Sequence, residues 1–376
     1  LVSSSAASDV YKRQSMRNLF SVLPFVALSF FCWGIYGPIL HEGQYAMGAD
    51  GVPSSLRPLI CVGIAYFIIA VLFPIGILKT KGEKGNWTTT GFIWSFAAGI
   101  LGAIGALGIV LAFKFKGKPV YVMPLVFGLA PVVNTFVTMF MARSFKQAST
   151  VFYLGVLIVA VGAAGVMFFK PSKPHADHPP ESVAQTEGHT DHDAAEKSGT
   201  EENATSKPKV DTPQTNYALV SLFIGLTALC WGSYGPVLHK GQAKMAGSKL
   251  RPLLCVGLAY FAVAVVIPIV LMPTFPEPGG FPIGGTLWSL GAGTAGALGA
   301  LGIIYAFNFG GKPIFVMPLV FGGAPVVNTV TTTITSKAYG DISPLFIMSL
   351  LLVICGAITV LIFAPRPSPP PKPSAH

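Results

Sequence analysis

Charged residues are scarce in this chain of 376 residues: they make up 11% of it, whereas hydrophobic residues make up 52%. An ordinary soluble domain carries roughly 25% charged residues. The low charge content therefore excludes an ordinary soluble domain and predicts a membrane protein. The formal net charge of +10 comes from Lys and Arg in short loops rather than on one face of a domain, so we do not expect nucleic-acid binding.

Acidic residues are absent from the apolar runs. Glu42, Asp50, Glu83, Glu277 and Asp341 are expected in loops, and the other acidic residues precede Met16 or lie between the two halves of the chain. Proton-driven exporters of cationic drugs rely on a carboxylate at membrane depth. The absence therefore disfavours a cation/proton antiporter and favours a carrier of a neutral or anionic polar solute.

Other signatures are also missing. The five cysteines form no Cys-x-x-Cys pair and all lie in apolar runs, which argues against both a disulfide framework and a zinc knuckle. No Gly-x-x-x-x-Gly-Lys-Ser/Thr loop is present, so ATP drive within this chain is unsupported. No nucleophile with a partner base lies at membrane depth, so the sequence predicts neither an enzyme nor a resident cofactor.

Apolar runs of the length that crosses a bilayer, about 20 residues, recur along the chain. Ten are predicted, near residues 20–40, 57–78, 91–113, 119–142, 151–169, 217–238, 252–273, 285–307, 313–335 and 344–364. The fold class expected is thus an all-α membrane protein with ten transmembrane helices.

The second half of the chain repeats the first. CWGIYGPILHEGQ from Cys32 returns as CWGSYGPVLHKGQ from Cys230, and LRPLICVGIAYF from Leu56 returns as LRPLLCVGLAYF from Leu250. The long phrase that begins GALGI and ends APVVNT also occurs in both halves. Five spans in each half is an odd number, so the second copy enters the membrane in the opposite orientation. The sequence predicts two inverted five-helix repeats, 16–170 and 217–364.

The remaining segments are predicted to lie outside the repeats. Residues 1–15 resemble translated sequencing adapter, and we expect a natural start at Met16. Residues 171–216 are polar and predict a disordered linker, and 365–376 form a proline-rich tail. The linker holds a weak candidate set of metal ligands, His175, His178, His189 and His192.

Three features together carry a family resemblance: the ten spans in two inverted fives, the Trp-Gly pair in the first span of each half, and the Pro-x-x-Asn-Thr phrase in the fourth. The chain from Met16 to Phe363 resembles the drug/metabolite transporter superfamily in its ten-span EamA-like form. The phrase AFKFKGKPVYVMPLVFG also resembles the sugar-uptake branch of that superfamily. The resemblance implies a secondary transporter whose substrate path is walled by the first, third and fourth spans of each half.

Two groups of residues are candidates for contact with a substrate. Polar side chains at membrane depth are costly and often functional, although they also join helices by hydrogen bonds. Aromatic rings beside a Gly-Pro pair suit a polar organic ligand. The predicted substrate-binding residues are Trp33, Tyr36, Asn134, Thr135, Trp231, Tyr234, Asn328 and Thr329.

Residues that bend helices or end the repeated phrase are candidate hinges and gates. Proline removes a backbone donor, and His and Gln at a helix end can gate a path or bond to loops. The predicted set is Gly37, Pro38, His41, Gln44, Pro131, Gly235, Pro236, His239, Gln242 and Pro325.

The function expected is secondary transport of a small polar metabolite by alternating access, without a carboxylate proton relay in the membrane. Basic residues near the span ends predict that both termini are cytoplasmic in a multi-pass protein of the cell (inner) membrane. The expected partners are the lipid bilayer and the small-molecule substrate, and a homodimer is left open. Two alternatives stay open as well: a divalent-metal transporter, and a membrane sensor or structural protein that acts through its linker.

Overall fold

Helices make up nearly all of the ordered backbone in the computed structural model, which describes residues 2–143, 145, 149–169, 215–335 and 342–363. No β-strand occurs among these residues. The first half contains α1 (Val2–Met47), α2 (Leu56–Phe67), the π-helical segment η1 (Ile68–Leu72), α3 (Phe73–Thr80), α4 (Thr89–Lys114), α5 (Pro119–Ala142) and α6 (Thr150–Phe168). The second half contains α7 (Tyr217–Lys244), α8 (Leu250–Phe261), the π-helical segment η3 (Ala262–Val266), α9 (Ile267–Leu271), α10 (Ile283–Asn308), α11 (Pro313–Thr335) and α12 (Pro344–Phe363).

Seven helical spans among the described residues are long and apolar enough to cross a membrane. They are Ser21–Met47, Leu56–Thr80, Thr89–Lys114, Pro119–Ala142, Tyr217–Lys244, Leu250–Leu271 and Ile283–Asn308. The helical fold and several membrane-crossing helices thus agree with the composition. The His-rich segment, the proline-rich tail and the candidate ligands His175, His178, His189 and His192 lie outside the described residues.

Local sequence explains where several helices begin. The side chains of Thr88, Ser149 and Asn216 accept hydrogen bonds from backbone N–H groups of the first turns of α4, α6 and α7, respectively. Proline opens α5, where the missing N–H would have had no helical partner.

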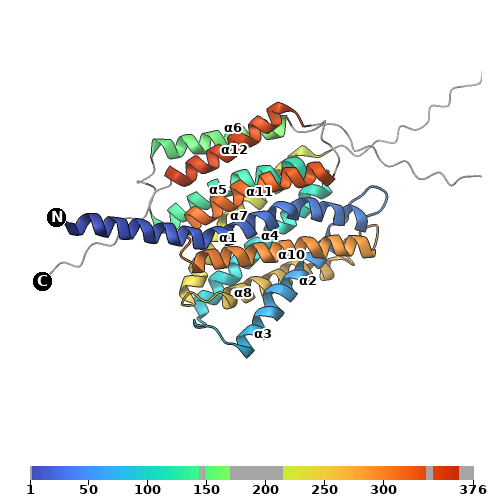
Figure 1. Ribbon diagram of the computed structural model, residues 1–376. Coiled ribbons are helices and arrows are strands. Elements are labelled where there is room, and N and C mark those ends of the chain that lie inside the picture. The colour runs from blue at the N-terminus through green and yellow to red at the C-terminus, as the bar shows by residue number, and fades with distance from the viewer. Residues whose placement is uncertain (1, 144, 146–148, 170–214, 336–341, 364–376) are drawn as a thin grey trace, which may run out of the picture. The chain divides into compact units, whose positions relative to one another are not determined.

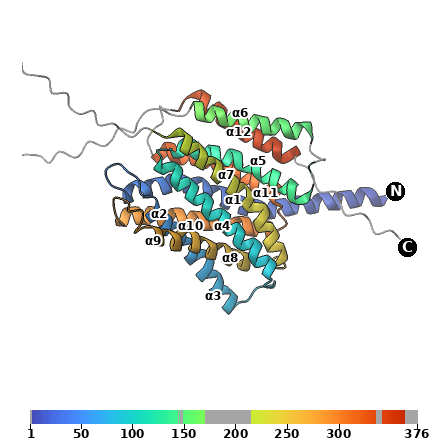
Figure 2. The ribbon, with the colours of Figure 1, turned by 180° about the vertical axis from the view of Figure 1, so that it is seen from behind.

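The helices pair across the two sequence copies. α1 packs against α10 and α7 packs against α4, while α5 lies beside α11 and α6 beside α12 (Figure 1). The rear view shows α7, α4 and α8 grouped on the other side of the same bundle (Figure 2). α2 contacts α10, and α8 contacts α4, so each second-span helix also packs on the opposite copy.

The first-span helices extend beyond the predicted apolar runs. α1 continues past residue 40 to Met47, and α7 continues past 238 to Lys244. Glu42, which we expected in a loop, is therefore in α1, with an exposed side chain. The extension has a physical reason, because Gln44 and Gln242 in the added turns are buried and hydrogen-bonded to neighbouring helices.

Candidate functional site

A small cavity lies where α1, α2 and α4 of the first copy meet α7, α8 and α10 of the second. Its volume is about 20 Å³, room for a water molecule. Three aromatic residues and one glycine from each copy line it: Trp33, Tyr36, Tyr66 and Gly102, with Trp231, Tyr234, Tyr260 and Gly296. Most of these residues lie close to the middle of their apolar helices.

The two tryptophans reach across to the opposite copy. Trp33 Nε1 donates to Gly296 O at 3.2 Å, and Trp231 Nε1 donates to Gly102 O at 3.1 Å. The indole rings lie with centroids 6.0 Å apart and planes 26° from parallel. The glycine stripes of α4 and α10 make this approach possible, because a Cβ at Gly105 or Gly299 would overlap a tryptophan ring.

Tyr36 and Tyr234 complete the contact between the aromatic pairs. The Tyr36 ring lies edge-on to Trp231 at 6.0 Å, and the Tyr234 ring lies edge-on to Trp33 at 6.1 Å. Both tyrosines are 3% exposed, and neither hydroxyl has a hydrogen-bond partner among the described residues. Buried hydroxyls are normally satisfied, so a pair of unsatisfied ones beside a cavity calls for an explanation.

Tyr66 and Tyr260 were not identified from the sequence. Their rings stack with centroids 3.6 Å apart and planes 2° from parallel. The signal was available, because both residues belong to the repeated LRPLICVGIAYF phrase, but the phrase reads as an ordinary apolar span.

A π-helical segment follows each of these tyrosines. Ile68–Leu72 and Ala262–Val266 precede Pro74 and Pro268, respectively, which have no N–H to donate to the helix ladder. The wider turns accommodate that gap within a continuous membrane helix, as local π adjustments do at prolines. Segments of this kind are frequent at functional sites.

The predicted polar pairs of the fourth spans lie between helices, outside the cavity lining. Asn134 Nδ2 donates to Pro313 O at 3.2 Å, and Asn328 Nδ2 donates to Pro119 O at 3.1 Å. These bonds join α5 and α11 reciprocally. Each asparagine still has a buried Oδ1 without a partner among the described residues.

The threonines beside the asparagines differ between the copies. Thr135 Oγ1 donates to Pro131 O at 2.8 Å within α5, whereas Thr329 Oγ1 has no partner among the described residues. The geometry supports the helix-joining role for the asparagines and gives no direct contact between the threonines and the cavity.

The predicted hinge residues lie within continuous helices. α1 and α7 continue through Pro38 and Pro236, and α5 and α11 continue through Pro131 and Pro325. Gly37 and Gly235 lie against the side chains of Met123 and Met317, where a Cβ would overlap them. These glycines therefore allow the first-span and fourth-span helices to approach closely.

The residues that end the repeated phrase are placed near opposite ends of the bundle. Gln44 Nε2 donates to Ser54 O and Val110 O, and Gln242 Nε2 donates to Ile304 O. The rings of His41 and His239 lie edge-on to Phe113 and Phe307, respectively. The glutamines are buried and connect the last turns of α1 and α7 to neighbouring helices, and their role as gates stays a prediction.

At one end of the bundle Glu277 caps α2, a helix whose own first residues supply no side-chain cap. Its carboxylate accepts hydrogen bonds from Ser54 Oγ at 2.8 Å, Ser55 N at 2.9 Å and Leu56 N at 3.0 Å. Burial alone would raise the pKa of Glu277, but these bonds and the nearby charge of Lys114 outweigh burial and lower the pKa below its usual range.

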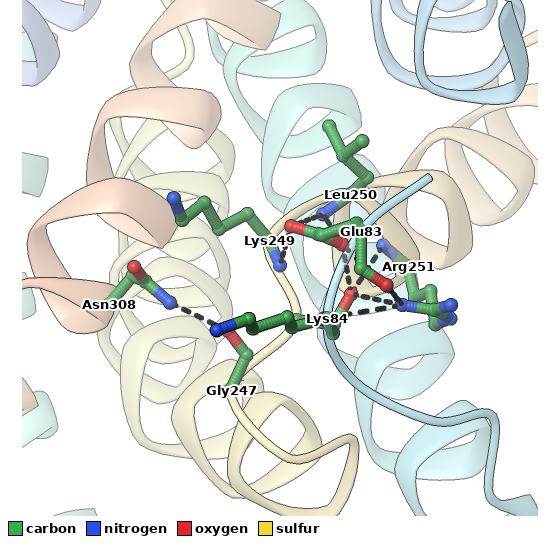
Figure 3. A network of polar contacts seen from close by, with 8 residues as sticks. Glu83, Lys84, Gly247, Lys249, Leu250, Arg251 and Asn308 are labelled. Atoms are coloured by element: carbon green, nitrogen blue, oxygen red, sulfur yellow. Dashed lines mark hydrogen bonds and ion pairs between the residues drawn. The ribbon is translucent and has the colours of Figure 1, made fainter. Parts of the chain in front are cut away.

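At the other end Glu83 caps α8 in the corresponding way. Its carboxylate accepts hydrogen bonds from Ser248 Oγ, from Lys249 N at 2.8 Å and from Leu250 N at 3.2 Å. Arg251 lies beside the same carboxylate, with Nη1 3.6 Å from Oε2 (Figure 3). The two glutamates occupy equivalent positions in the repeated sequence, 27 residues after Leu56 and Leu250, and sequence reasoning gave them no role.

We call the two sites the Glu277 end (Ser54, Ser55, Leu56, Arg57, Lys114, Glu277 and Pro278) and the Glu83 end (Glu83, Lys84, Ser248, Lys249, Leu250 and Arg251). Each carboxylate comes from the loop after the second-span helix of its own copy and caps the second-span helix of the other copy. A partly buried anion at a helix N-terminus satisfies orphan N–H groups and is favoured by the helix dipole.

Comparison with known proteins indicates the fold alone. No family model and no curated protein matches the chain. One solved structure, described as "Crystal structure of protein", aligns with a TM-score of 0.52 and 16% identity, over 92% of this chain and 97% of that chain. Among the described residues no group of three or more His, Cys, Asp or Glu is placed to hold a metal ion.

Proposed function

We propose that this chain is a secondary transporter that carries a small polar metabolite by alternating access, with ten spans arranged as two inverted five-helix repeats. The single observation that carries the proposal is the aromatic cavity, to which both sequence copies contribute equivalent residues near the middle of their membrane-crossing helices. Transporters built from inverted repeats bind substrate near the bilayer midplane at the repeat interface.

The inverted arrangement is supported by contacts that recur with the copies exchanged. Trp33 bonds to α10 as Trp231 bonds to α4, and Asn134 bonds to Pro313 as Asn328 bonds to Pro119. The end of α1 lies beside the start of α10, since Gly280 N donates to Met47 O. The end of α7 lies likewise beside the start of α4, since Thr88 Oγ1 donates to Lys244 O.

Alternating access is supported by the placement of the carboxylates. Glu277 and Glu83 tie loops of one copy to helices of the other at two different ends of the helices that line the cavity. Breaking one set of contacts while the other holds would open the cavity to one side of the membrane only. Discrete rearrangement of packed helices around a fixed site is the general basis of such switching.

We propose further that the protein lies in the cell (inner) membrane with both termini cytoplasmic. The support is the distribution of Lys and Arg in the loops, which sets orientation in helical membrane proteins. In this arrangement the Glu83 end, with Lys84, Lys249 and Arg251, faces the cytoplasm and the Glu277 end faces outward.

Flux measurements in proteoliposomes test the proposal. The full chain is reconstituted and offered radiolabelled D-glucose, L-leucine, nicotinamide, choline and succinate separately. We expect saturable uptake of at least one solute, reduced at least tenfold by Trp33→Ala. The matched control is Trp288→Ala, because Trp288 is 47% exposed on α10 and is not part of the cavity lining.

Folding must be checked, because removing a buried tryptophan costs about 3–5 kcal/mol of stability. Trp33→Phe keeps an aromatic ring but removes the bond to Gly296 O, and it should fold and carry the solute more slowly. Absence of flux for all five solutes, or full flux in a folded Trp33→Ala protein, would overturn the proposal.

A further inference from the structure

We propose that the central cavity binds a ligand without net charge, one that presents a flat apolar face to the indole rings and hydroxyl or amide groups to Tyr36 and Tyr234. The inference rests on the proposed transport function and narrows it from polar metabolites in general to uncharged ones. Four features of the cavity support the inference: the hydroxyls without a partner, the indole N–H groups that already have one, the absence of charged side chains from the lining, and the spacing of the rings.

The free hydroxyls are the first feature. Tyr36 and Tyr234 are 3% exposed, and their hydroxyl oxygens have no hydrogen-bond partner among the described residues. Leaving a buried hydroxyl unsatisfied destabilises a protein, and two such groups at equivalent positions line the same cavity. A phenolic hydroxyl both donates and accepts, so a ligand hydroxyl or amide group satisfies it in either role.

The second feature is that the indole N–H groups already donate hydrogen bonds within the protein. Trp33 Nε1 and Trp231 Nε1 donate to the backbone of Gly296 and Gly102, respectively, so neither N–H remains to meet a ligand. What the tryptophans offer is their ring faces, which stack on apolar or flat surfaces. We therefore expect the tyrosine hydroxyls to form hydrogen bonds with polar groups at the ends of a ligand, and the indole rings to stack on its flat face.

Charge is the third feature. The cavity lining consists of tryptophan, tyrosine and glycine, and includes no Asp, Glu, Lys, Arg or His. An ion that leaves water for such a site loses its hydration and finds no opposite charge there. Cation–π contacts recover only part of that loss for a cation, and no acidic side chain among the lining residues supplies the rest.

The ring spacing defines the shape of the ligand. The indole centroids are 6.0 Å apart, whereas a flat group between two rings needs about 7 Å, twice the contact distance of about 3.5 Å between carbon atoms. The rings must therefore part by roughly 1 Å, which suits a flat molecule better than a bulky one. The π-helical segments directly after Tyr66 and Tyr260 are positions where the second-span helices can adjust.

A matched series of probes tests the inference. Nicotinamide, 1-methylnicotinamide and nicotinate share one flat ring and are neutral, cationic and anionic at pH 7. D-glucose and D-glucuronate form a second pair that differs by a carboxylate. The purified full chain in lipid nanodiscs is titrated with each by calorimetry, and its melting temperature is recorded, because a bound ligand stabilises the fold.

The expected result is binding of at least one neutral probe, at least tenfold tighter than its charged counterparts. The double variant Tyr36→Phe/Tyr234→Phe should weaken that binding at least tenfold without lowering the melting temperature of the free protein, because it removes two unsatisfied buried hydroxyls. Tyr153→Phe is the matched control, since Tyr153 is 48% exposed on α6.

Two results would overturn the inference: no binding of either neutral probe, or binding of a charged probe as tight as that of its neutral counterpart and sensitive to the tyrosine pair. The flux assay separates the two proposals. If a charged solute is carried and its flux depends on Tyr36 and Tyr234, transport stands and the uncharged class is wrong. If no solute is carried and no probe binds, both proposals fail.

Discussion

The Glu277 end and the Glu83 end have the same design but different contacts. At the Glu277 end, Arg57 donates to the backbone oxygens of Glu277 and Pro278 at 2.8 and 2.9 Å, and Lys114 lies 3.6 Å from the carboxylate. At the Glu83 end, the bonds of Arg251 to the backbone oxygens of Glu83 and Lys84 are 3.4 and 3.5 Å long.

The lysine is the clearest difference between the ends. The position equivalent to Lys114 in the repeat is Asn308, which donates to Gly247 O rather than to Glu83 (Figure 3). Among the described residues, the ion-pair partner of the Glu277 carboxylate is Lys114, whereas that of the Glu83 carboxylate is Arg251, at 3.6 Å. The arginine bonds are longer at the Glu83 end than at the Glu277 end, and for this reason we expect the Glu83 end to open more readily.

The largest expected effect is on access to native cysteines. Cys61 lies one turn after Arg57, and Cys255 lies one turn after Arg251, both buried. In purified chains that keep one of these cysteines and lie in lipid nanodiscs, where both faces are open to solvent, a water-soluble thiol reagent should modify Cys255 faster than Cys61. Glu277→Ala should speed modification of Cys61 at least tenfold, because losing charge-assisted hydrogen bonds costs about 1.5–3 kcal/mol and 1.4 kcal/mol is tenfold.

Glu83→Ala is the mirror control and should speed modification of Cys255 but not of Cys61. Equal acceleration of both cysteines by either variant would mean that the carboxylates stabilise the whole bundle rather than separate ends. Modification rates measured by mass change over time distinguish these outcomes.

A second prediction concerns acid. The pKa of Glu277 is lowered in the folded protein, so its contribution to stability is present above the ordinary glutamate pKa and is lost as pH falls through the lowered value. We expect the melting temperature to fall as the pH drops below the ordinary glutamate pKa of 4.5, and Glu277→Gln to reduce that fall. Glu42→Gln, at an exposed position on α1, should leave the pH profile unchanged.

The smallest effect is expected from exchanging the unequal positions. Lys114 is 40% exposed, so its ion pair with Glu277 contributes at most about 1 kcal/mol. Lys114→Asn should lower the melting temperature by about 1–3 °C at low salt and by less at high salt. Asn308→Lys should slow modification of Cys255 if a lysine there reaches Glu83. If neither the melting temperature of Lys114→Asn nor the modification rate of Cys255 in Asn308→Lys changes, the lysine does not explain the difference between the two ends.

Much of the arrangement could be predicted from the duplicated sequence. The repeated phrases identified Trp33, Tyr36 and their counterparts as residues near one site, and the structure places all four in the lining of one cavity. The repeated GALG sequences place Gly105 and Gly299 at equivalent positions, and both glycines lie against an indole ring. The grouping was accessible because a repeat pairs equivalent residues before any coordinates are known, whereas the contact of these residues with a substrate stays a prediction.

Other features depended on contacts between the copies. From the sequence, Tyr66 and Tyr260 are ordinary residues of apolar spans. Their rings stack only because α2 packs against α8. Glu83 and Glu277 lie in loops, and the sequence does not show that each loop reaches a helix of the other copy. A glutamate shared by two otherwise different loops was the signal, Glu-Lys-Gly in one and Glu-Pro-Gly in the other.

The reach of each tryptophan into the opposite copy also bears on how such a chain evolves. Trp33 needs a glycine on α10, and Trp231 needs one on α4, so neither half alone contains the complete lining of the cavity. A substitution that disrupts the contact between a tryptophan and its glycine can be compensated by a second substitution in the other half. Fusing the halves in one polypeptide fixes their stoichiometry at one to one. Residues of one half that contact the other half can then change only together with the residues that they contact.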